Sequence, residues 1–168
     1  WAFRQTEALK QARHFVNWWI DNRQVDGEFG GGLSDDTDLM NQWPGLALMG
    51  VDTDKLTGSL GQLIEATHRN GMWTNGLGTI TTDELHVYEE GVNAISQMSY
   101  LTADDPLNVE RLMATAARYS DLTAVNPAGH RHFISNYFGG EEIIRETPWQ
   151  WQKGQSVLIL HPGIRLVD

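Results

Sequence analysis

The chain has 168 residues, 40% of them hydrophobic, which suffices for one globular core. Its 22 acidic residues outnumber 12 lysines and arginines, and the resulting net charge of −10 disfavours nucleic acids and anionic membranes as partners. The charge does not exclude an anionic sugar held in a local cationic pocket. The absence of cysteine excludes disulfides, thiolate metal sites and a cysteine nucleophile, and no apolar run is long enough to span a bilayer.

Tryptophan and glycine are over-represented, with seven and 17 residues. Aromatic platforms beside tight loops are common where sugars bind, although tryptophan is also ordinary core material. The chain begins at Trp1 without a charged and apolar leader. We therefore expect a processed chain or a piece of a longer protein.

The first predicted element is an amphipathic helix over residues 3–20, because Leu9, Ala12, Val16 and Trp19 recur at helical spacing. A glycine-rich and acidic segment, residues 26–45, follows and predicts a structured loop.

Within this loop a short helix is expected from Ser34 or Asp35, and Pro44 suits the first turn of another. Asp35 and Asp36 are candidates for substrate binding, although such residues often only cap a helix. Trp43 is a candidate for stacking on a sugar ring. The run SDDTD resembles a calcium loop in composition but lacks the spacing and distal glutamate of an EF-hand, so we expect no cofactor.

The next helix is predicted after Asp52 or Asp54, with a stripe of leucines from Leu56 and a glycine stop at Gly71. A second glycine-rich loop covers residues 71–83. Its Trp73 and Asn75 are further candidates for contacts with a sugar.

Residues 83–101 carry the most informative polar stripe. In a helix, His86, Glu90, Asn93 and Gln97 share one face. A solvated face usually carries lysine or arginine, and none occurs between Arg69 and Arg111, so the stripe either lines a cleft or faces solvent. If it lines a cleft, its N-terminal part is the catalytic candidate.

Asp105 and Pro106 predict the start of a helix that runs to about Tyr119, and residues 121–140 read as loop. This loop holds a dense cationic cluster, which suits an anionic group unless the arginine simply pairs with a nearby glutamate. Strand signals are few, and residues 157–160 predict either a short strand or a buried helical piece. The candidates in this part are His130, Arg131, His132 and Tyr137.

An internal repeat is suggested at an offset of 44 residues, which pairs Gly27 with Gly71 and Phe29 with Trp73. The alternative is coincidence in a glycine-rich chain. We expect residues 1–168 to form a single all-α domain of successive α-hairpins whose glycine-rich loops gather at one end.

The two loops, the motif HVYEEGVN at 86–93 and the motif AGHRHF at 128–133 together resemble the (α/α) toroids of carbohydrate-active enzymes. The resemblance covers roughly residues 3–140 and is greatest to the toroid domains of polysaccharide lyases from bacteria. Such rings have more helices than this chain offers, so the chain would form part of a ring. The resemblance also implies a secreted or periplasmic protein.

The resemblance implies β-elimination on a uronic acid, in which the carboxylate is neutralised, the C5 proton is removed and the leaving oxygen is protonated. By residue type, these roles fall on Asn93, His86 or His132, Tyr137 and Arg131, with Glu90 on the same stripe.

Two other functions remain open from the sequence. A glycoside hydrolase would use a carboxyl pair, such as an aspartate of the first loop opposite Glu89 or Glu90. A non-catalytic sugar-binding or scaffold module would bind through the same residues without turnover.

Overall fold

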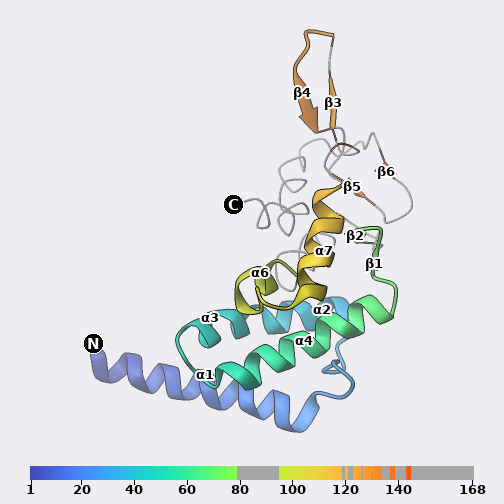
Figure 1. Ribbon diagram of the computed structural model, residues 1–168. Helices are drawn as coiled ribbons and strands as arrows, with labels where there is room; N and C mark the ends of the chain where they lie inside the picture. The colour runs from blue at the N-terminus through green and yellow to red at the C-terminus, as the bar shows by residue number, and fades with distance from the viewer. Residues whose placement is uncertain are drawn as a thin grey trace.

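The computed structural model describes residues 1–78, 95–118, 120, 123–125, 127–133, 137–138 and 143–144. Most of these residues are helical, as expected for an all-α chain (Figure 1). The helices of the first half are α1 (Ala2–Arg23), α2 (Leu33–Leu39), the 3-10 turn η1 (Met40–Gln42), α3 (Trp43–Leu48) and α4 (Thr53–Arg69). None of the described helices has the length and apolarity needed to cross a membrane.

The predicted helix over residues 3–20 is confirmed as α1. Its apolar stripe faces the core, where Val16 is fully buried and Leu9, Ala12 and Trp19 pack beside it. The helix forms because these side chains fall on one face at intervals of three and four residues.

Helix α4 begins after Asp52, as predicted, but the Asp52 side chain does not cap it. The carboxylate instead accepts hydrogen bonds from Arg13 Nε and Nη2 and from Asn17 Nδ2, all at 2.7 Å. These bonds, from Arg13 first and then from Asn17, hold the pKa of Asp52 below its usual value. A second ion pair, between Lys55 and Asp21 at 2.6 Å, also joins α1 to α4, which lie side by side in Figure 1.

The core lies mainly between α3 and α4. Leu56, Leu60 and Leu63 on α4 are fully buried, which confirms the predicted leucine stripe. The helix ends at the predicted stop, where Gly71 has a φ of +75°. Its N–H bonds to His68 O, and Met72 N–H bonds to Thr67 O, so the end is a Schellman motif.

The second half begins with the 3-10 turn η2 (Ile95–Gln97) and the short helix α6 (Met98–Leu101), which are the described end of the predicted helix 83–101. Helix α7 (Pro106–Ala116) starts as predicted, because the Asp105 carboxylate accepts from Leu107 N–H at 2.9 Å. It ends three residues before the predicted Tyr119.

Three short antiparallel ribbons occur in or at the end of two predicted loop segments, residues 71–83 and 121–140, so the expectation of loop alone was wrong there. A strand of two or three residues has no period that a sequence can reveal. The pairs are β1 (Trp73–Thr74) with β2 (Leu77–Gly78), β3 (Thr123–Val125) with β4 (Arg131–Phe133), and β5 (Tyr137–Phe138) with β6 (Ile143–Ile144). In Figure 1 the β3–β4 ribbon projects beyond the helices.

Two tight turns of the same kind occur in the structure, but they match different residues from those that the predicted repeat pairs. Asp26 and Gly27 form a two-residue turn in which φ is +52° and +98°, and Asn75 and Gly76 form another with φ of +52° and +78°. Positive φ at both central residues is the requirement of a type I′ turn. The predicted match of Gly27 to Gly71 is therefore wrong, since Gly71 ends a helix.

The first turn packs on α4 and the second packs on α7. A Cβ at Gly27 would lie 2.3 Å from Gln62 O on α4, and a Cβ at Gly76 would lie 2.4 Å from Ala114 O on α7. Only glycine allows this closeness together with positive φ. Helices α4 and α7 thus support the two turns in the same way.

Candidate functional site

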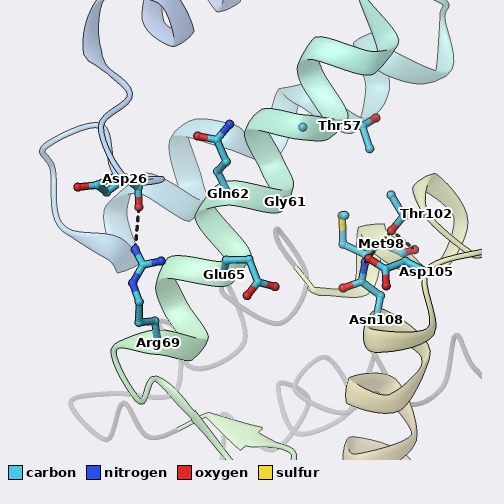
Figure 2. Close-up of a pocket in the computed structure, with 11 residues that line it drawn as sticks. Asp26, Thr57, Gly61, Gln62, Glu65, Arg69, Met98, Thr102, Asp105 and Asn108 are labelled. Atoms are coloured by element: carbon cyan, nitrogen blue, oxygen red, sulfur yellow. Dashed lines mark hydrogen bonds between the residues drawn. The ribbon is translucent and has the colours of Figure 1, made fainter.

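Two cavities lie along the contact between α4 and α7, which we call the seam. The smaller has a volume of about 240 Å³ and contains two of the residues predicted to bind a sugar, Trp73 and Asn75. The larger, of about 560 Å³, lies between α4 on one side and α6 with the start of α7 on the other (Figure 2). We take the smaller as the candidate functional site because it unites aromatic, cationic and amide groups.

Trp73 is positioned by the Schellman turn, which sends the chain back along the last turn of α4. Its ring stacks on His68, with centroids 6.2 Å apart and planes inclined by 22°. Trp73 Nε1 is buried and has no hydrogen-bond partner within the part of the chain that the structure describes. An indole N–H is a donor only, so a buried one without an acceptor requires an explanation.

His68 contributes a neutral imidazole to the same cavity. Its Nδ1 lies 2.9 Å from Ile64 O. A carbonyl can only accept, so Nδ1 carries the proton and Nε2 has a lone pair in the neutral ring. Burial lowers the pKa of His68 below 6.5, which keeps the ring neutral at pH 7.

Arg111 supplies the positive charge. Its Nη1 lies 2.5 Å from Glu65 Oε1, and this ion pair joins α7 to α4. The Arg111 side chain is only 15% exposed, whereas that of Glu65 is 51% exposed. The hydrogen bond from Arg111 holds the pKa of Glu65 below its usual value, so the pair stays ionised at neutral pH.

The turn Asn75–Gly76 closes the cavity and is fixed to α7. Thr115 Oγ1 donates to Gly76 O at 2.7 Å, and Arg118 Nη1 donates to Asn75 O at 3.2 Å. The Asn75 side chain is exposed at the rim, where it can contact a ligand.

Trp43 does not have the predicted role. It is fully buried in the core, where its ring lies 6.0 Å from that of Phe29 and its Nε1 donates to Ser59 Oγ at 3.2 Å. A ring with no exposed face cannot stack on a sugar, so the prediction of a substrate contact at Trp43 was wrong.

Asp36 also has a structural role in place of the predicted one. It is 2% exposed, and its carboxylate accepts from Phe29 N–H at 2.7 Å and Gly31 N–H at 3.1 Å. The side chain thus ties the glycine loop together. Asp35 is exposed on α2 and remains free for the predicted contact.

Of the other predicted residues, those that the structure describes are not among the lining residues of either cavity. His86, Glu90 and Asn93 lie outside the described residues. His130 and Arg131 are exposed at the tip and start of the β3–β4 ribbon, with His132 paired to Ala124 in β4 and Tyr137 paired to Ile144 in β5.

The described lining of the smaller cavity has three residues with titratable side chains, none of which was predicted: His68, Glu110 and Arg111. The signal for His68 was its position three residues before the glycine that ends a helix, since a Schellman turn brings the next aromatic residue back onto that position.

No group of three or more His, Asp or Glu side chains suited to a metal ion occurs in the described ranges. Comparison with known proteins finds no matching family model, no similar curated sequence and no similar solved structure. The function must therefore be inferred from the site itself.

Proposed function

We propose that this chain is part of an (α/α) toroid of a polysaccharide lyase and that the cavity at Trp73 binds a uronic acid residue of its substrate. The observation that carries the proposal is the buried indole N–H of Trp73, which has no partner among the described residues, in a cavity that also contains Arg111 and a neutral His68. The two similar turns, one packed on α4 and the other on α7, support an array of α-hairpins, the element from which such toroids are built.

Each group in the cavity suits one feature of a uronic acid. The indole can stack on a sugar face while its N–H donates to a hydroxyl. Arg111 can bind the carboxylate with two parallel N–H groups, in exchange for or in addition to its bond to Glu65. Asn75 at the rim offers both a donor and an acceptor to hydroxyl groups.

His68 fits the role of the base in the β-elimination. In the proposed reaction its Nε2 takes the C5 proton, the C5–H electrons form the C4–C5 double bond, and the C4–O bond breaks. The leaving oxygen takes a proton from an acid, for which the predicted residues His86, His132 and Tyr137 remain the candidates. Neutralising the carboxylate with Arg111 stabilises the negative charge that develops in this step.

The test is incubation of the chain with polyuronates, such as polygalacturonate, alginate and hyaluronan, with the ultraviolet absorbance and the reducing ends both measured. A rise in absorbance from the unsaturated product supports a lyase. New reducing ends without absorbance indicate a hydrolase, and binding without either product indicates a sugar-binding module.

Two tryptophan variants test whether the Trp73 cavity is the site of binding or turnover. Trp73→Ala is expected to abolish binding or turnover. Trp18→Ala is the matched control, because Trp18 is 47% exposed on α1 and lines neither cavity. Equal activity of both variants would remove the Trp73 cavity from the proposal.

A further inference from the structure

A site for a single uronic acid uses only the smaller cavity and leaves the larger cavity without a role. We infer that it is a second subsite, which binds a neutral, hydroxyl-rich residue of the same glycan. This inference rests on the proposed function. It follows from the shape, the lining and the position of the cavity.

The wall formed by α4 includes two glycines, where only backbone lines the cavity. Gly58 and Gly61 lie in this 17-residue helix, and a Cβ added at either would meet no atom within 4 Å. Glycine in the interior of a helix is destabilising relative to alanine, and neither position needs glycine for packing. The two glycines leave room for a ligand of about 560 Å³, which is within the ordinary range of ligand sites.

The opposite wall presents oriented polar groups (Figure 2). Asn108 is 7% exposed, and its Nδ2 donates to Thr102 Oγ1 at 2.8 Å and to Asp105 Oδ2 at 3.2 Å. Both amide hydrogens are thereby engaged, so Oδ1 is the atom that can accept from a ligand hydroxyl. Rigid acceptors of this kind suit a polyol more than an apolar ligand.

The charge of the lining disfavours a second carboxylate. Asp26, Glu65 and Asp105 line the cavity, against the single cation Arg69 among the described lining residues. Arg69 already donates to Asp26 O at 3.0 Å, as the dashed line in Figure 2 marks. A neutral sugar residue avoids the repulsion that a uronate would meet there.

The two cavities are neighbours along one seam. Glu65 lines the larger and Arg111 lines the smaller, and the two side chains are in direct contact. A glycan that places a uronate beside Arg111 therefore reaches the larger cavity with the adjoining residue. The fitting substrate is a glycan in which a uronate adjoins a neutral sugar.

The inference is tested with Gly58→Ala and Gly61→Ala, which place a methyl group in the larger cavity. The probes are a tetrasaccharide of alternating glucuronate and N-acetylglucosamine, methyl glucuronoside as the single-uronate comparison, and tetragalacturonate as the all-uronate comparison. Affinities are measured by titration calorimetry. Gly45→Ala is the matched control, because Gly45 is an exposed helical glycine with open space around it that lines neither cavity.

The wild type is expected to bind the alternating tetrasaccharide more tightly than methyl glucuronoside or tetragalacturonate. Gly58→Ala and Gly61→Ala are expected to weaken binding of the tetrasaccharide about tenfold and to leave binding of methyl glucuronoside unchanged. All three variants should have a raised Tm, because alanine favours a helix over glycine, so weaker binding will not reflect misfolding.

If the two cavity variants bind the tetrasaccharide as tightly as Gly45→Ala does, the second subsite is overturned while the first is left intact. Preference for tetragalacturonate would overturn the neutral specificity. If the wild type binds none of the probes and forms no product from any polyuronate, the proposed function and this inference are overturned together.

Discussion

Asp26 and Asn75 hold equivalent positions in two successive units of the chain. Both have a φ of +52°, and each backbone carbonyl accepts a hydrogen bond from an arginine 43 residues further on, Arg69 for Asp26 and Arg118 for Asn75. In both cases a glycine follows and lies against helix backbone, on α4, which ends with Arg69, for Gly27 and on α7, which ends two residues before Arg118, for Gly76. This repeated contact sets the position of α7 against α4 and so forms the seam that contains both cavities.

The contact at Gly76 predicts an unusually large loss of stability on substitution. Gly76→Ala would force both a positive φ and a Cβ 2.4 Å from Ala114 C and O, which requires the turn to leave α7. We expect a loss of about 3 kcal/mol in the free energy of unfolding, measured with denaturant. Gly71→Ala is the control, since φ is +75° there but the added Cβ would lie in open space, and about 1 kcal/mol is expected. Equal losses would contradict the close packing of the turn.

The core position of Trp43 predicts a structural phenotype. Trp43→Ala removes a fully buried ring and its bond to Ser59, so a loss of about 3–5 kcal/mol is expected. Trp18→Ala, at a 47% exposed position, should cost about 1 kcal/mol. Chemical denaturation of both variants measures the difference. If the Trp43→Ala protein is stable but has lost sugar binding, the original prediction that Trp43 stacks on a sugar would be supported instead.

The carboxylate of Asp36 is expected to stabilise the glycine loop. Asp36→Ala would leave two N–H groups, of Phe29 and Gly31, without their acceptor, and the first of these is buried. A loss of about 2–3 kcal/mol is expected. Asp35→Ala, one residue earlier and exposed, should change the free energy of unfolding by less than about 0.5 kcal/mol. Thermal melts of the pair are sufficient, and similar Tm values would contradict the role given to Asp36.

The burial of His68 predicts a dependence of stability on pH. Its folded-state pKa is below the unfolded value of 6.5, so in this range the unfolded chain binds more protons than the folded chain. Stability should therefore fall as the pH falls below 6.5 and level off below the folded-state pKa. Denaturant midpoints between pH 8 and pH 5 should show this fall in the wild type. It should be smaller in His68→Gln, and His14→Gln, at an exposed position on α1, should behave as the wild type.

The long helices could be predicted from the sequence because their signals are local. Apolar spacing identifies α1 and α4, the Asp105 side chain caps α7, and Gly71 ends α4 through its own backbone conformation. The two-residue strands and the packing of Gly76 on Ala114 could not be predicted. They depend on contacts between residues far apart in the chain, and such short strands have no period.

The candidate site could be predicted only in part, for a related reason. Trp73 and Asn75 were identified because a glycine-rich loop with an aromatic residue is typical of sugar sites. Trp43 satisfied the same rule, yet it packs against Phe29 in the core. His68 and Arg111 looked like ordinary helix residues, because a lowered pKa and a joining ion pair arise only when α4 and α7 come together.

The central claim is that the buried N–H of Trp73, which has no partner in the described part of the chain, donates to a bound sugar. The most direct measurement is the NMR signal of that group. The indole Nε1–H resonances of the tryptophans are recorded during titration with the alternating glucuronate tetrasaccharide, and Trp73 is assigned with Trp73→Phe. We expect the Trp73 signal to shift to a saturating value while that of Trp43, bonded to Ser59, stays in place. A Trp73 signal that does not move while the tetrasaccharide binds would contradict the account.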